Sequence, residues 1–512
     1  MGSIFRRKMS IKNNKGSISI FVTLLCLVLV GLFSVIMKSV NIRNAQSKAS
    51  MALKSAVSSI KADYNRYIFD NYHILLFDIT YYGKGEGYTE ELIKSYMEYT
   101  LGSGFTVKDV VLSDVNHIEK NDVAALKHQI NDYMKYSAGK NVAEKLLEKA
   151  GVGSDKNENI IDEKSLLEMD KEAEDAADKM DSESGKPGKS SGNNNGNDGT
   201  DKQEKNSDEE AGGNTHKDKE DPRVKTRIMT PGIVALFVKP DDANFCENII
   251  NVPELPSFTE LKSVIKKING VDVRFEDYGN LRGSLTEGDG WGKELKNRAV
   301  SIAYANEVFK SLRDNKGEKE TFVNLEREYL ICGEITDQDN YTSIVKKLVN
   351  LRFGFNFGYI IKDKEKMARL SVLAKTLTVF APYLQPVMKY LLAGSWAYIE
   401  SCSDAKYLVK GHKIKLMKEK KDWKTDLYDS LEMLAEEPEG DDEEGLDYDE
   451  YLMILMGLEG DIVFYRMLDL MEINTAIQYP DFKMKNAVVE FAVKVTVEYG
   501  DKTFELNKEE GY

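Results

Sequence analysis

Hydrophobic residues are concentrated in one long run near the start of the chain. Residues 18–37 contain no charged side chain, and a helix of this length, at ~1.5 Å per residue, spans the roughly 30 Å hydrocarbon core of a bilayer. The pattern predicts a transmembrane helix that begins at Ile18 and ends at Met37. We prefer an uncleaved anchor to a cleaved signal peptide, because the run continues into Lys38 without a small-x-small cleavage site.

The helical pattern continues beyond the apolar run as a narrow face of small residues. Ala45, Ala49, Ala52 and Ala56 recur every three or four positions, which places them on one side of a helix. Since no proline interrupts residues 17–70, we expect one helix of roughly 80 Å. Its alanine face fits two arrangements equally: packing on its own domain or packing against partner subunits.

The next part of the chain mixes the two secondary-structure periods. Helices are predicted at 88–101 and 122–150, and a valine-rich strand at 105–118. Residues 154–222 are then dominated by acidic residues, Ser, Gly, Asn and Lys, a composition that cannot bury enough apolar surface to form a core. We interpret them as an acidic disordered linker or insertion.

The remainder predicts a larger domain. Its expected elements are strands at 228–238 and 271–278, helices at 294–312, 340–351 and 451–476, and a proline-broken, buried helical core at 367–401. From Val489 to Tyr499 apolar and polar residues alternate, and Gly500 and Asp501 can turn the chain into a second strand. We expect a C-terminal β-hairpin there.

Together these elements predict an α+β protein. The expected divisions are a basic cytoplasmic tail at 1–17, the transmembrane helix at 18–37, a stalk helix at 38–78, a small α+β domain at 79–153, the acidic linker at 154–222 and the larger α+β domain at 223–512.

Charge is distributed very unevenly along the chain. The 512 residues have a net charge of −15, yet ten basic residues and no acidic one precede Asp63. Basic flanks are attracted to anionic lipid head groups, so a membrane is an expected partner, whereas the acidic main body argues against nucleic acid. Because basic residues lie on both sides of the helix, charge alone hardly decides orientation; we favour a cytoplasmic N-terminus and an extracytoplasmic main domain.

Several familiar catalytic and metal-binding motifs are absent from the sequence. The sequence lacks HExxH, GxSxG, GxxxxGK[ST] and CxxC motifs, and its four cysteines are too scattered to indicate a disulfide framework. We therefore expect no enzyme, no catalytic residue, no cofactor and no metal site.

Several blocks resemble a known group of membrane proteins. They are the run from Lys15 to Asp78, EYLICGEITDQDN from Glu328, WAYIESCSDAKYLVKGHKIKLMKEKKDW from Trp396 and YDEYLMILMGLEGDIVFYRMLDLMEIN from Tyr448. They are similar to an uncharacterised family encoded with the tight-adherence (Tad/Flp) pili of Gram-positive bacteria, whose N-terminus is related to the TadE and TadG pseudopilins.

The resemblance carries an expectation about processing. Pseudopilins of this class are cut after a glycine at the membrane edge, and Gly16 followed by Ser17 matches that cut. The glutamate expected five residues into the mature chain is replaced by Phe21. The resemblance also implies other pilus or secretion-system membrane subunits as partners of the N-terminal helix.

Two functions follow from these observations. The first is a membrane-anchored structural or accessory component, similar to pseudopilins, of a tight-adherence-type pilus or secretion system at the cell surface. The alternative is a single-pass surface module that binds a peptide, glycan or cation without catalysis, which an aromatic-lined pocket would support.

Overall fold

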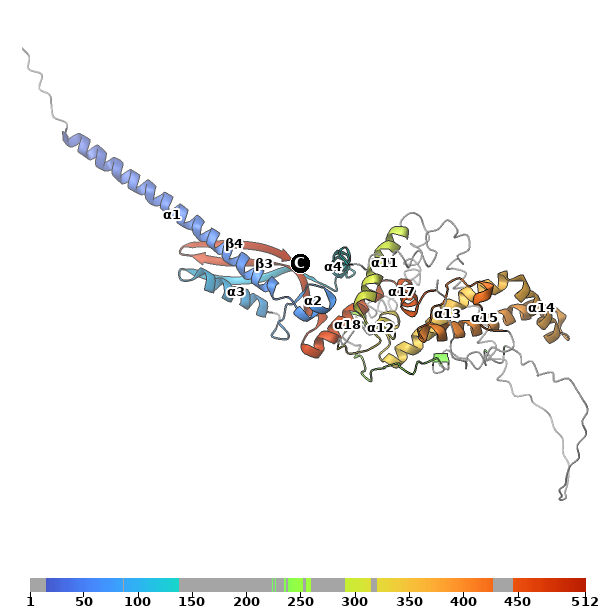
Figure 1. Ribbon diagram of the computed structural model, residues 1–512. Helices are drawn as coiled ribbons and strands as arrows, with labels where there is room; N and C mark the ends of the chain where they lie inside the picture. The colour runs from blue at the N-terminus through green and yellow to red at the C-terminus, as the bar shows by residue number, and fades with distance from the viewer. Residues whose placement is uncertain are drawn as a thin grey trace, which may run out of the picture. The chain divides into compact units, whose positions relative to one another are not determined.

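The computed structural model describes residues 15–85, 87–137, 223, 226, 234–235, 238–251, 255–258, 291–314, 320–426 and 445–512. These residues form helices and antiparallel strands (Figure 1), so the expected mixed α+β class is confirmed. The expected linker at 154–222 lies outside the described residues.

The chain divides into two compact units. Unit 1 combines Met1–Leu126 with Thr475–Tyr512, and unit 2 comprises Lys127–Asn474. The C-terminal hairpin therefore belongs with the N-terminal segment and not, as the sequence suggested, with the larger domain. The first strand of the hairpin pairs with residues 105–117, which ties the hairpin to the N-terminal segment. The prediction was wrong because a pairing partner 370 or more residues distant leaves no local signal in the sequence.

The secondary structure of unit 1 consists of a long helix, shorter helices and four strands. They are α1 (Lys15–Ala62), α2 (Arg66–Tyr72), β1 (Phe77–Asp78), α3 (Tyr88–Leu101), β2 (Phe105–His117), the start of α4 (Ala124–Met134), η4 (Met484–Asn486), β3 (Ala487–Tyr499) and β4 (Lys502–Gly511).

Strand β3 is the centre of an antiparallel sheet. It pairs with β2 along one edge, from Phe105 opposite Tyr499 to His117 opposite Val488. Its other edge pairs with β1 and β4 in succession, and β3 and β4 form the hairpin predicted around Gly500. The predicted strand at 105–118 and helix at 88–101 are likewise confirmed.

The prediction of a single helix over residues 17–70 is wrong beyond Ala62. α1 ends at Ala62, and Asn65 begins a new helix by accepting a 3.0 Å hydrogen bond from the Ile68 amide. The backbone amide of Asn65 in turn donates a hydrogen bond to the Leu76 carbonyl oxygen. Because asparagine side chains cap helix N-termini, this residue redirects the chain at a point where no proline or glycine marks a break.

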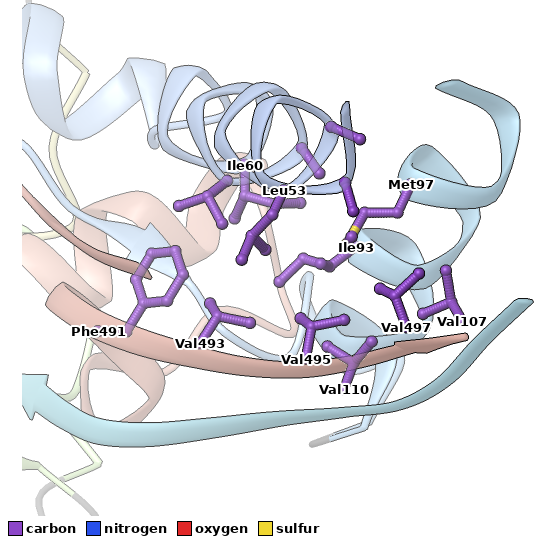
Figure 2. Close-up of a cluster of buried hydrophobic side chains, with 14 of the residues drawn as sticks. Leu53, Ile60, Ile93, Met97, Val107, Val110, Phe491, Val493, Val495 and Val497 are labelled. Carbon is purple, nitrogen blue, oxygen red and sulfur yellow. The ribbon is translucent and has the colours of Figure 1, made fainter. Parts of the chain in front are cut away.

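Helices α1 and α3 cover one face of the sheet. The core between them contains Leu53 and Ile60 from α1, Ile93 and Met97 from α3, and Val495 from β3 (Figure 2). On the opposite face of β3, Lys494 is exposed. This division into an apolar and a polar face is typical of an antiparallel sheet with a single helical layer.

Unit 2 is helical in its described part. It contains the end of α4, α11 (Trp291–Val308), α12 (Glu326–Cys332), α13 (Asp337–Lys362), α14 (Lys364–Leu377), η2 (Pro382–Leu384), α15 (Gln385–Val409), η3 (Lys420–Asp422), α17 (Tyr448–Glu459) and most of α18 (Ile462–Gln478). The helices expected at 294–312 and 340–351 are thus confirmed, the second being longer than predicted.

Two other expectations for this unit are corrected. Val234 and Ala235, placed in a predicted strand at 228–238, are helical; the second predicted strand, at 271–278, lies outside the described residues. The single helix expected at 451–476 is two, α17 and α18, because Gly460 adopts φ 77° and ψ −149°, a conformation that ends α17.

Helices α13, α14 and α15 lie side by side and form an arm (Figure 1). Their shared core includes Ile360, Leu370, Ala374, Leu392 and Trp396. The proline-broken helix predicted at 367–401 is confirmed, but the expectation that this segment is buried is only half correct. The break leaves its apolar turn exposed, with Phe380 at 101% of its maximal exposure.

Candidate functional site

The first half of α1 presents an apolar surface on all sides. From Ile20 to Met37 the large hydrophobic side chains are each 45–68% exposed. Water-exposed surface of this kind is costly, at ~25 cal/mol per Å². Among the described residues, this is the one helix long and apolar enough to cross a membrane.

The second half of the same helix is packed against unit 1. Ala45, Ala49, Ala52 and Ala56 are at most 5% exposed, and the last three join the core formed with α3 and β3 (Figure 2). Of the two arrangements predicted for the alanine face, the structure shows packing on the helix's own domain. The small side chains let the helix lie close to the sheet.

Polar contacts bind both ends of this half of α1 to other elements of unit 1. Lys48 donates from Nζ to the Leu101 carbonyl oxygen at 2.8 Å, at the C-terminus of α3, where the helix dipole favours a cation. Near the end of α1, the Tyr512 hydroxyl donates to the Lys61 carbonyl oxygen at 2.6 Å. Lys61 also pairs with Glu510 at 3.4 Å.

The residues expected to be processed lie at the start of the helix. Gly16 and Ser17 fall in its first turn, which begins at Lys15. Phe21, in place of the expected glutamate, is 68% exposed and is part of the apolar surface. The backbone of the expected anchor, from Ile18 to Met37, is helical throughout.

A second distinctive feature, in unit 2, is a fully buried ionic cluster, which we call the arm cluster: Arg352, Asn356, Glu400, Asp404 and Lys418. Arg352 Nε donates to Asp404 Oδ2 at 2.9 Å, and Lys418 Nζ lies 2.6 Å from Asp404 Oδ1 and also contacts Glu400. Burial alone raises the pKa of Asp404, but Lys418 and Arg352 outweigh it, so the pKa lies below its ordinary value.

The arm cluster joins segments that are distant in sequence. Glu400 accepts hydrogen bonds from the Thr425 amide at 2.8 Å and the Lys424 amide at 3.0 Å, so it orders the chain after η3. Two positive and two negative groups balance, and buried charges of this kind are tolerated when they are paired and hydrogen-bonded. The arrangement is that of a structural network.

Sequence reasoning missed the arm cluster. A signal was present, because Arg352 and Asn356, and likewise Glu400 and Asp404, are four residues apart and so share a helix face. What the sequence does not show is that these two polar pairs face each other across α13 and α15.

Helix α12 buries three consecutive charged residues. Glu326, Arg327 and Glu328 are all 0% exposed. Arg327 is paired with Asp314 at 2.8 Å and Asp449 at 3.1 Å. Glu326 and Glu328 accept hydrogen bonds from the Lys310 and Leu312 amides, so the three side chains hold the segment before α12 and the start of α17.

Burial strongly affects the ionisation of the Glu328 carboxyl group. Its Oε1 accepts from the Leu312 amide at 2.9 Å and the Tyr448 hydroxyl at 2.8 Å, and its Oε2 is buried without a hydrogen-bond partner. Burial raises the pKa of Glu328 to about 7, although the two donors act in the opposite direction. The group therefore changes charge near neutral pH.

A lysine is held between two tryptophan rings on the arm. Lys366 Nζ lies 4.0 Å from the centre of the Trp396 ring and 4.2 Å from that of Trp423, a cation–π arrangement. Burial lowers the pKa of Lys366 to about 8. The contacts hold α14 to α15 and to the segment after η3.

Within the described ranges, no group of three or more His, Cys, Asp or Glu side chains is arranged to hold a metal ion. The four cysteines are all free thiols; Cys26 lies exposed on α1, and burial raises the pKa of Cys402 above its ordinary value.

Comparison with known proteins gives one match. Residues 212–499, more than half of the chain, match the model of a family of unknown function, DUF5702. The match includes most of unit 2 and strand β3, whereas α1 lies outside it. No curated protein and no solved structure matches the chain.

Proposed function

We propose that this chain, a member of DUF5702, a family whose function is unknown, is a membrane-anchored structural or accessory subunit similar to pseudopilins. The assembly to which it would belong is a tight-adherence-type pilus or secretion system. In this proposal α1 is the anchor, its N-terminus is cytoplasmic and the rest of the chain is extracytoplasmic. The proposal assigns no catalysis and no cofactor.

The observation that carries the proposal is the division of α1 into two halves. Exposed apolar residues up to Met37 suit a lipid or subunit environment, while the alanine face from Ala45 onward is already occupied by the helix's own sheet. The free half is thus the surface left for partner helices.

Site-specific photo-crosslinking in the native membrane tests the proposal. A benzophenone amino acid at Phe33, which is 62% exposed on the apolar half, should give adducts with other membrane subunits of the pilus or secretion machine. The control position is Tyr136 in unit 2, which is 92% exposed and should give none of these adducts. Adducts with lipid alone at Phe33, together with unchanged surface pili in a deletion strain, would contradict the proposal.

The N-terminus distinguishes the two forms of the proposal. Intact-mass analysis of the native protein that gives a chain beginning at Ser17 would show cleavage after Gly16 despite Phe21, and would support a filament subunit. A chain beginning at Met1 would support a permanently anchored accessory component.

A further inference from the structure

The turn between α14 and α15 is the most exposed apolar surface of the described part of unit 2. We call residues 377–390 the arm tip. Phe380 is 101% exposed, Tyr383 80%, Val379 62% and Val387 58%. Side chains of this size are seldom exposed together on a surface that only water contacts.

The arm tip is not a loosely folded end of the helical core. Just inside it, Leu370, Ala374 and Leu392 are 0% exposed and hold α14 against α15. Within the turn, the Ala381 amide donates to the Thr378 carbonyl at 2.9 Å, and the Leu384 amide donates to the Ala381 carbonyl at 2.9 Å. The backbone is therefore internally hydrogen-bonded while its side chains point outward.

The charge around the arm tip is opposite to that of the protein as a whole. The chain has a net charge of −15, yet residues 370–399 contain two basic residues, Lys375 and Lys389, and no Asp or Glu. Lys375 lies two residues before the tip and is exposed, and Lys389 lies within the tip. Lys389 Nζ also lies 5.3 Å from the centre of the Tyr390 ring.

We propose that the arm tip inserts into the head-group region of an anionic phospholipid bilayer. Phe380 and Val379 would enter the acyl boundary, Tyr383 would lie at head-group level with its hydroxyl toward water, and Lys375 and Lys389 would contact lipid phosphates. The surface is that of an interfacial contact and not of a second crossing, since α1 is the only spanning candidate among the described helices.

Membrane contact at the arm tip would not require high intrinsic affinity. If α1 anchors the chain, the arm tip is covalently tethered to a membrane, and tethering raises the effective concentration of the surface for a weak contact. Lysine side chains near an anionic surface strengthen such a contact electrostatically. This inference goes beyond the proposed subunit function and is independent of any pilus.

The test uses the full chain reconstituted into vesicles of phosphatidylcholine, with or without phosphatidylglycerol. An environment-sensitive fluorescent amino acid replaces Phe380, or Tyr136 as a control that is 92% exposed. At position 380 we expect a blue shift and severalfold stronger quenching by lipid-borne spin labels in the anionic vesicles. Position 136 should show neither change.

Charge reversal tests the role of the lysines. Lys375→Glu combined with Lys389→Glu should reduce the quenching at position 380 severalfold. The matched control is Lys364→Glu, at the exposed start of α14, which should leave the quenching unchanged. Circular dichroism checks that each variant is folded.

Two results would overturn the inference. One is a probe at position 380 that is not quenched in either kind of vesicle, although flotation shows that the chain is bound to the vesicles. Flotation separates a tip that does not enter the bilayer from an α1 helix that does not anchor the chain. The other is a blue shift in detergent that grows with protein concentration and is not quenched by spin-labelled lipid, because this identifies a second protein copy as the occupant.

Discussion

The Tyr512 hydroxyl donates a 2.6 Å hydrogen bond to the carbonyl oxygen of Lys61, so a residue just after β4 is bound to the last turn of α1. This carbonyl is one of the last four of α1, which have no partner within the helix. The contact closes unit 1 by joining two segments 451 residues apart in sequence.

The Tyr512→Phe variant should loosen the end of α1. It removes the hydrogen bond but keeps the ring near Lys61, so we expect unit 1 to lose about 0.5–1.5 kcal/mol of stability. Hydrogen-exchange mass spectrometry of peptides covering residues 52–62 measures this loss. Tyr99→Phe, at a side chain that is 91% exposed, is the control and should change nothing.

Replacement of Ala52 by phenylalanine should disrupt the packing of α1. Ala52 is 1% exposed and faces the sheet, whereas the neighbouring Met51 is 69% exposed. Ala52→Phe should therefore cost about 1–3 kcal/mol or displace the helix, and Met51→Phe should be tolerated. Equal urea midpoints for unit 1 in the two variants would show that the alanine face is not packed as described.

The arm cluster should be intolerant of single changes. Arg352→Met leaves Asp404 and Glu400 buried with one cation, and we expect a loss of about 3–5 kcal/mol in the stability of unit 2. Arg66→Met removes an exposed ion pair with Asp70, in which Arg66 is 82% exposed, and should cost less than ~1 kcal/mol. The free energies of unfolding of the two variants are compared by chemical denaturation monitored by hydrogen exchange.

Glu328 should make unit 2 less stable as pH rises through neutrality. The folded state raises the pKa from 4.5 to about 7, so between these values the folded protein binds a proton that the unfolded chain has released. Unfolding then becomes easier with increasing pH across this window, and the stabilisation is complete below it.

The Glu328→Gln variant should remove this pH dependence. Its amide oxygen can accept from Leu312 and Tyr448, and its amide nitrogen occupies the position without a partner. At pH 8 we expect the variant to be about 1–3 kcal/mol more stable than the wild type, at ~1.36 kcal/mol per pKa unit, with a smaller difference at pH 5. Glu320→Gln, at an exposed residue, is the control; a wild type equally stable at both pH values would contradict the assignment.

Local pattern was sufficient for the elements that carry one clear period. The alternation from Val489 to Tyr499 and the Gly500–Asp501 turn predicted the β3–β4 hairpin, and the proline-broken helix at 367–401 was found in the same way. What the sequence could not show was the unit to which the hairpin belongs, because β3 pairs with β2 across a separation that carries no local signal.

The candidate site was predicted in position but not in detail. The uncharged run from Ile18 to Met37 located the membrane-length helix, and the alanine spacing located its packing face. The sequence did not show which elements pack against that face; in the structure they are α3 and β3. Partner choice for an alanine stripe depends on tertiary packing, which helical periodicity does not encode.

Alkaline carbonate extraction of native membranes tests most directly whether α1 anchors the chain in a membrane. We predict that the wild-type chain stays in the membrane pellet. A variant with Leu25→Arg and Val28→Arg, at positions 47% and 61% exposed, should move to the supernatant. The matched control, Leu25→Ala with Val28→Ala, should stay in the pellet, and a wild-type chain found in the supernatant would contradict the account.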